Sequence, residues 1–229
     1  MSALLAAASS SSVTLNLGGQ LSKPSESIVI IISLTLLSVA PALLIMLTSF
    51  TRIAVVLSLT RNALGLQGIP PNQVIAGLAL FLSLFIMAPT ISKVNSTAVQ
   101  PYLHGQLTAT QAYQQGEVPI RDWMLKQTRT EELAVFVKTA HQHPARPQDV
   151  SMAALIPAFI LSELKTAFII GFVIFIPFVI IDLVVGSTLM SMGMMMLPPT
   201  LISLPFKLLL FVLVDGWTLI AHNLVASFR

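Results

Sequence analysis

The sequence predicts an all-helical membrane protein, and three observations lead to that prediction. Hydrophobic residues make up 55% of the 229 residues and charged residues only 9%, whereas about a quarter of a soluble domain is charged. The apolar residues form runs that approach or exceed the ~20 residues a helix needs to cross a bilayer. Prolines and a few charged residues interrupt these runs, which indicates broken, proline-kinked helical hairpins buried in a larger assembly.

Composition also excludes several classes of protein and site. The chain contains no cysteine, so disulfides and thiolate zinc sites are impossible. Its net charge of +3 is spread along the sequence without a basic cluster, which argues against nucleic acid as a partner. Residues 1–27 form either an N-terminal tail or a signal segment, because they are apolar and small in part but lack a basic start.

Residues 28–92 are predicted to form a first apolar helical hairpin. Its two runs, 28–50 and 74–92, are each about as long as a membrane span. Pro41 should bend the first run, and the pair Pro70-Pro71 requires a non-helical connection between the two.

Residues 93–150 differ from the rest of the chain and are predicted to form a polar, helical, extracytoplasmic insertion. They contain six Lys or Arg and five Asp or Glu, and apolar residues recur at helical spacing in 119–127 and 130–140. Arg52 and Arg61 precede the second apolar run without an acidic residue, which favours the cytoplasm for that connection. The insertion is then expected outside the cytoplasm.

Residues 151–229 are predicted to form a second apolar hairpin, which brings the count to four spans with both termini outside the cytoplasm. Its runs cover 153–185 and 200–225. Prolines inside them should each free backbone carbonyls that only protein or trapped water can satisfy. These prolines are Pro157, Pro177 and Pro205.

A methionine-rich segment, SMGMMMLPPT at 191–200, separates the two runs of the second hairpin. Five of the ten methionines fall within residues 190–196. Methionine is unbranched and polarizable and fills irregular apolar space, so loop packing or lipid contact is one interpretation. Thioether sulfur also suits copper(I), which makes a copper(I) transporter an alternative, although no cysteine and no second methionine cluster accompany the segment.

Charged residues inside the apolar runs are expected to have partners, because a charge at the bilayer centre costs about 2.5–3.5 kcal/mol. These residues are Glu163, Lys165, Asp182, Lys207 and Asp215. Glu163 and Lys165 point to opposite sides of a helix and cannot pair with each other. Lys207 is the natural partner for Glu163, within one chain or between neighbouring copies. Snorkelling lysines with a hydrated Glu163 are the alternative.

Five segments resemble, in order, those of the FliP family of flagellar type III protein-export gate subunits. They are TSFTRIAVVLSLTRNALGLQGIPPNQV, LALFLSLFIMAPT, PAFILSELKTAF, SMGMMMLPP and LISLPFKLLLFVLVDGW. Co-linear motifs of this length are far more specific than a short pattern. The virulence injectisome homologue shares most of them and is the alternative identification.

The resemblance implies a subunit of a helical, multi-subunit pore in the bacterial inner membrane at the flagellar basal body. In the family, five copies assemble with FliQ and FliR, beside the export components FlhB and FlhA, and the insertion faces the periplasm. Unfolded flagellar export substrates pass through the pore, membrane lipids surround it, and no cofactor is implied. Glu163 and Lys207 match family positions that form an ion pair between neighbouring subunits.

The resemblance also gives the methionine segment a role. Met194, Met195 and Met196 match the family's methionine ring, which closes the pore as a gasket. Flexible side chains on a loop hinged at Gly186 and Gly193 could part around many unfolded chains and then close a dry constriction.

The sequence contains no recognisable catalytic or metal-binding constellation. His222 is the one histidine in an apolar run, and neither an HExxH nor a Gly-x-Ser-x-Gly motif is present. His141 and His143 lie two residues apart beside Pro144, a pattern more typical of a solvated linker than of a metal site. We therefore expect neither enzymatic activity nor a bound metal.

Overall fold

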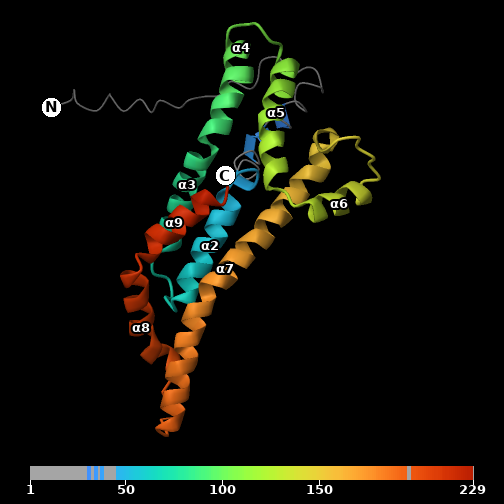
Figure 1. The fold of residues 1–229 in the computed structure, drawn as a ribbon. Helices are drawn as coiled ribbons and strands as arrows, with labels where there is room; N and C mark the ends of the chain where they lie inside the picture. The colour runs from blue at the N-terminus through green and yellow to red at the C-terminus, as the bar shows by residue number, and fades with distance from the viewer. Residues whose placement is uncertain (1–29, 32–33, 36, 39–44, 195–196, 229) are drawn as a thin grey trace, which may run out of the picture. The chain divides into compact units, whose positions relative to one another are not determined.

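The computed structural model describes residues 30–31, 34–35, 37–38, 45–194 and 197–228. All regular secondary structure in these ranges is helical, which confirms the predicted fold class (Figure 1). The elements are α2 (Phe50–Ala63), α3 (Asn72–Val94), the π-helical turn η1 (Asn95–Val99), α4 (Gln100–Leu103), α5 (Ala109–Gln127), α6 (Thr130–Thr139), the 3-10 turn η2 (Pro147–Asp149), α7 (Met152–Ser191), α8 (Pro199–Leu213) and α9 (Gly216–Ala226).

The chain divides into two units, Met1–Leu43 and Leu44–Arg229. Six residues of the first unit are described; they are helical, and their large apolar side chains are exposed. Pro41, which is predicted to bend this segment, and residues 1–27 lie outside the described residues. The second unit contains every helix from α2 to α9.

The second unit begins with α2 and α3, which flank the predicted proline turn. α2 buries positions i, i+3, i+4 and i+7, so that one of its faces points into the core. These residues are Ile53, Val56, Leu57 and Thr60. The helix ends before Gly65, whose φ of 77° lies in the left-handed region that glycine adopts without a steric penalty. The turn through Pro70 and Pro71 then leads into α3.

The polar insertion is a helical hairpin that continues the second apolar run. α3, η1 and α4 form one helix of 32 residues, Asn72–Leu103, so no loop marks the predicted boundary at residue 93. α5 packs back against this helix and begins at Ala109, because Thr108 and Gln111 form a capping box. The sequence prediction missed that cap and began the helix at Pro119, which lies inside α5.

The helix expected at 130–140 is confirmed as α6 (Thr130–Thr139). Two glutamates occupy its first turn, where the helix dipole favours negative charge. Its apolar side chains Leu133, Phe136 and Val137 face the buried cluster that the start of α7 helps to form. α6 therefore docks on α7 through an amphipathic face.

α7 is one unbroken helix of 40 residues. The sequence predicts interruptions at Pro157 and Pro177, but the helix continues through both, because a proline removes a single backbone hydrogen bond and the turns on either side remain bonded. Pro205 likewise lies inside α8. The break in the second hairpin falls instead at Asp215, where α8 and α9 meet at 60°.

Two clusters of buried apolar side chains form the core of the second unit. The first core cluster lies between α2, α7, α8 and α9 and includes Ile53, Leu57, Ala167, Phe211 and Leu224. The second core cluster lies between α3, α5 and α7 and includes Met87, Trp123, Met124, Leu155 and Phe159. Phe228, just after α9, packs against both clusters.

α2 and α7 cross closely at Gly171. A Cβ atom at this position would lie 2.3 Å from Leu59 Cδ1 and 3.2 Å from Leu59 Cβ, so the Leu59 side chain must change its conformation and the two helices must give by a few tenths of an ångström. We expect Gly171→Ala to lower the free energy of unfolding by about 1–3 kcal/mol through overpacking. Denaturant unfolding of the detergent-solubilised chain, followed by circular dichroism, measures this change.

Gly77→Ala in α3 is the matched control, because nothing lies within 4 Å of a Cβ atom built at that position. This substitution is expected to be neutral or to stabilise the helix by up to about 1 kcal/mol, the difference in helix propensity between glycine and alanine. Equal effects at Gly171 and Gly77 would contradict the close crossing of α2 and α7.

Two described helices are long and apolar enough to cross a membrane, Asn72–Leu103 and Met152–Ser191, and the bent α8–α9 pair makes a third if it counts as one span. The predicted count of four includes the run 28–50, of which residues 28–29, 32–33, 36 and 39–44 lie outside the described residues. Much of the apolar surface is uncovered in the single chain. Phe81, Phe85, Phe172 and Leu183, for example, are 67–72% exposed.

Candidate functional site

The loop between α7 and α8 is the first candidate site, because it carries the methionine cluster. α7 ends in a Schellman motif: the Gly193 amide donates to the Met190 carbonyl at 3.0 Å, and the Met194 amide donates to the Leu189 carbonyl at 3.0 Å. Gly193 has a φ of 77°, which a side chain would strain. The local backbone thus requires this glycine, and its role as a hinge stays a prediction.

The methionines described at this end of α7 are exposed. Met190, Met192 and Met194 have 64%, 68% and 40% of their surface accessible. Met195 and Met196 lie outside the described residues, so the structure locates only the first member of the predicted gasket. The loop forms the tip of the α7–α8 hairpin (Figure 1), and the whole segment 183–206 contains no charged residue.

Gly186 lies inside α7 and not in the loop, which corrects its assignment as a loop hinge. Its backbone belongs to the continuous hydrogen-bonded helix. A Cβ atom at Gly186 would lie 3.7 Å from Pro199 Cβ, so this residue faces the beginning of α8. Its contribution in this structure is to the packing of the hairpin.

Glu163 forms a buried ion pair with Arg52. Arg52 Nε donates to Glu163 Oε2 at 2.9 Å, and Arg52 Nη2 donates to Glu163 Oε1. The two side chains are 4% and 0% exposed, and the two parallel bonds use the planar fork of the guanidinium. The pair ties α2 to α7 across the interior.

Lys207 pairs with Asp182 on the facing helix. Its Nζ donates to Asp182 Oδ2 at 2.6 Å and to the Ala63 carbonyl at 3.3 Å. Ser203, one turn before Lys207, donates its hydroxyl to Asp182 Oδ1. These contacts compensate the burial of the ammonium and join the end of α2 to α7 and α8.

The prediction that Glu163 pairs with Lys207 inside one chain is therefore wrong, because each has another partner in the chain. Asp182 faces Lys207 because the two lie at nearly equal sequence distances from the methionine loop, as facing residues of a hairpin do. That spacing could have identified the second pair. No spacing signal identifies Arg52, whose position depends on how α2 packs against α7. The pairing of Glu163 with Lys207 between neighbouring copies stays a prediction.

The other charges predicted to be buried differ in exposure. Lys165 and Asp215 are exposed in the single chain, and Asp182 is half-buried. Asp215 begins α9, since its carbonyl accepts the Leu219 amide at 3.0 Å, and it has a left-handed φ of 49°. It ends the apolar run of α8 instead of sitting within it.

Lys165 extends from α7 to the first turn of α6. Its Nζ lies 2.7 Å from Glu132 Oε1 and 3.3 Å from Glu131 Oε2. The hydrogen bond from Lys165 is the main reason that the pKa of Glu132 lies below its usual value. Both glutamates belong to the insertion, so this contact links the insertion to the apolar helix.

Acid is expected to loosen α6 from α7. A carboxyl whose pKa is lower in the folded than in the unfolded state stabilises the fold above its unfolded pKa, about 4.3 for glutamate. The contribution of Glu132 is then lost as the pH falls through its lowered folded pKa. We expect amide hydrogen exchange in α6, corrected for intrinsic rates, to rise below about pH 4. Glu132→Gln should abolish the rise in exchange at low pH. If the variant and the unsubstituted protein show the same pH profile, Glu132 is not its cause.

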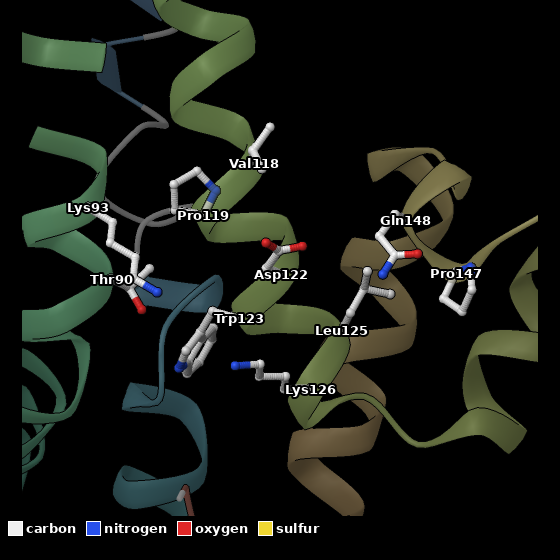
Figure 2. Close-up of a pocket in the computed structure, with 10 residues that line it drawn as sticks. All are labelled: Thr90, Lys93, Val118, Pro119, Asp122, Trp123, Leu125, Lys126, Pro147 and Gln148. Carbon is white, nitrogen blue, oxygen red and sulfur yellow. The ribbon is translucent and has the colours of Figure 1, made fainter. Parts of the chain in front are cut away.

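A pocket of about 500 Å³ lies between α3, α5 and the linker at η2 (Figure 2). Lys93 comes from α3, while Asp122 and Lys126 come from α5, so charges of both signs line it. Arg121 fixes the linker beside the pocket, because its Nη1 donates to the Gln148 carbonyl at 2.9 Å and to the Val150 carbonyl. The mixed charges favour no single class of ligand.

The described ranges contain no group of three or more His, Asp or Glu side chains that could hold a metal ion. His141 and His143, on the linker after α6, are both exposed. Within these ranges the structure therefore offers no metal centre built from these side chains. The methionine loop, the buried Arg52–Glu163 pair and the partly buried Lys207–Asp182 pair remain the candidate functional features.

Comparison with known proteins identifies the family of this chain. The FliP family model matches residues 33–224. The flagellar biosynthetic protein FliP of Bacillus subtilis (strain 168) is 54% identical over 205 residues, which cover 89% of this chain and 93% of the relative. Proteins of the same name from Pectobacterium carotovorum subsp. carotovorum and Aquifex aeolicus (strain VF5) are 53% and 51% identical over 89% of this chain, covering 78% and 87% of the relatives. With a family match over most of its length and relatives at about half identity, the chain belongs to the FliP family.

Proposed function

We propose that this chain is a pore-forming core subunit of the flagellar type III protein export gate. Copies of the chain assemble with partner subunits into a channel in the bacterial inner membrane, and unfolded flagellar proteins pass through it. The role is structural and not enzymatic. The name that the relatives share, flagellar biosynthetic protein, supports the flagellum over the injectisome.

The observation that carries the proposal is the uncharged tip of the α7–α8 hairpin. Segment 183–206 has no charged residue, and Asp182 and Lys207, which pair with each other, stand at its two ends. A ring of such tips would form a constriction lined by apolar side chains. Apolar constrictions exclude ions by dewetting, and methionine side chains adapt to partners of different shape. A gate for varied unfolded chains needs both properties.

The uncovered apolar surface supports an assembly. A soluble monomer rarely exposes large contiguous apolar patches, and this chain exposes such side chains on α3, α7 and α8. We propose that further copies, five in all, together with FliQ and FliR, cover much of this surface and that lipid covers the rest. FlhB and FlhA adjoin the assembly, and the insertion, residues 93–150, lies on the periplasmic side.

Native mass spectrometry tests the proposal. The chain is extracted in detergent, alone and co-expressed with its presumed partners, under conditions that retain copper. A homo-oligomer that takes up two further kinds of subunit and carries no metal is the expected result. A monomer or trimer that holds copper(I) would overturn the proposal and make the methionines ligands.

A further inference from the structure

The last helix, α9, is held in an unusual way at its two ends. At one end it meets α8 at a bend of 60°. At the other end the chain places Ser227 and Phe228 on the buried Arg52 side chain. Figure 1 shows α9 leading from α8 back to the region where α2, α5 and α7 approach one another. Each end has a distinct physical role.

The bend is concentrated in two residues. Asp215 has φ 49° and ψ 54°, a left-handed conformation that is uncommon for a residue with a side chain. Gly216 follows, and a Cβ atom there would lie 2.3 Å from Cε2 of the Phe211 ring. The pair thus combines a sparsely populated backbone conformation with a position that admits no side chain, as expected of a pivot between two helices.

The far end of α9 is anchored by polar contacts with two helices. Arg52 Nη1 donates to the Ser227 carbonyl at 3.2 Å and to the Ser227 hydroxyl at 3.1 Å. Gln127 at the end of α5 donates its Nε2 to the Phe228 carbonyl at 3.4 Å. Arg52 is the same residue that neutralises Glu163, so the anchor shares its cation with the buried ion pair.

The Phe228 ring contacts Arg52 of α2 and Trp123 of α5. The ring lies 3.9 Å from Arg52 Cζ, which is close enough for a cation–π interaction. It also stacks on Trp123 of α5, with ring centroids 6.4 Å apart and an interplanar angle of 17°. Because Phe228 packs against both core clusters, this one side chain connects the insertion to the apolar helices.

Between its ends α9 is attached by a narrow stripe. Its buried residues are Gly216, Ile220 and Leu224, which recur every fourth position on one face. The intervening residues Leu219, His222 and Asn223 are exposed. α9 packs against α8 and α3, and Trp217 packs against the first core cluster, with its ring centroid 5.2 Å from that of Phe211. A short helix with a hinge at one end can open as a unit, and its opening would uncover the part of the first core cluster that Ile220 and Leu224 cover.

We propose that α9 is a hinged strap, which turns at Asp215–Gly216 and is latched by Ser227 and Phe228 onto the Arg52–Glu163 ion pair. In the latched state, shown by this structure, the insertion and the apolar helices are joined through Phe228. In the released state Arg52 loses its contacts with Ser227 and the aromatic ring and becomes accessible to water. The strap would thereby couple the position of α5 to the state of the buried ion pair, whether or not the chain forms an export gate.

The absence of cysteine from the sequence permits a direct test by spin labelling. Labels are placed at Asn223→Cys on α9 and Gln115→Cys on α5, both exposed positions, in the full chain in lipid nanodiscs. The latched strap predicts one narrow distance distribution. Phe228→Ala, or deletion of residues 227–229, should add a broad population at longer distances, whereas Phe228→Tyr, which keeps the ring, should not.

The matched control is Phe206→Ala, which removes an exposed phenylalanine of α8 remote from the latch. It should leave the distance distribution unchanged. An unchanged, narrow distribution in Phe228→Ala and in the deletion would overturn the proposal, as would the same broadening in Phe206→Ala.

Hydrogen exchange of the unsubstituted chain tests the strap independently of any variant that fails to fold. The hydrogen-bonded amides of α9, from Leu219 to Ala226, should exchange together, about tenfold or more faster than the buried amides of α2, because one opening event at the hinge exposes them all. Exchange of α9 as slow as that of α2 would show that no separate opening occurs and would overturn the proposal.

Discussion

Replacement of Glu163 by alanine is expected to lower the free energy of unfolding by about 3–5 kcal/mol, because it leaves a buried cation without its counter-charge. The stranded residue is Arg52, whose Nε and Nη2 both donate to Glu163. The variant should yield little folded protein and fail to enter the assembly. Unfolding in denaturant and native mass spectrometry of the extracted protein measure the two effects.

Two further variants separate a lost ion pair from lost packing. Glu163→Gln keeps nearly the same shape and one of the two acceptors of Arg52, so it should be less damaging than Glu163→Ala. Arg52→Met combined with Glu163→Leu replaces the pair with apolar side chains of similar size, which can be neutral or stabilising. If the double variant is as unstable as Glu163→Ala, the cost does not arise from an uncompensated charge.

A double-mutant cycle also identifies the partner of Glu163 in each state. In the isolated chain, alanine substitutions at Glu163 and Arg52 should show a large interaction energy, and those at Glu163 and Lys207 a small one. If Glu163 pairs with Lys207 of a neighbouring copy, as predicted, the interaction energy between these two residues should be large only in the assembled complex. If the assembled complex shows no interaction energy between Glu163 and Lys207, the inter-subunit pair is refuted.

Changing Met194, Met195 and Met196 together to alanine is expected to leave assembly intact and to make the gate leak ions several-fold more than the unsubstituted gate. The truncated side chains would no longer fill the constriction, so water and ions could enter it. The fold should tolerate the change, since Met194 is exposed at the tip of the hairpin. Ion flux into liposomes that contain the purified complex measures the leak, and native mass spectrometry checks the assembly.

Leucine at the same three positions provides the matched control. It restores apolar volume but lacks the flexibility of methionine, so it should close the pore to ions and yet slow the export of bulky unfolded chains. Met190→Ala, at an exposed position outside the predicted gasket, should not leak. Equal leaks from Met190→Ala and from the triple alanine variant would exclude a local gasket.

The helical class, the α7–α8 hairpin and α6 could be predicted because they depend on local patterns. Long apolar runs, the glutamates at the start of α6 and the glycine after α7 each act within a few residues along the chain. The start of α5 is equally local, in the capping box of Thr108 and Gln111, whereas the apolar spacing at 119–127 predicts only the second half of the helix.

The partner of Glu163 could not be predicted for a physical reason. α7 is apolar on all sides, and such a helix gives no periodic signal for the face that packs against a given neighbour. Only the packing of α2 across α7, with its close approach at Gly171, brings Arg52 to Glu163. The break at Asp215, by contrast, has a local signal, because the dipeptide Asp215-Gly216 is typical of turns even between the apolar sequences of α8 and α9.

The length of α7 has a consequence for how the cell must make this protein. At 1.5 Å per residue, its 40 residues extend about 60 Å, twice the ~30 Å hydrocarbon thickness of a bilayer. Such a helix either tilts strongly in the lipid or extends beyond it into contact with other protein. Within its most apolar stretch the chain itself buries only 11% of the residues. A copy synthesised without its neighbours is therefore an orphan subunit, prone to aggregation or proteolysis. Balanced, simultaneous synthesis of the subunits would protect it.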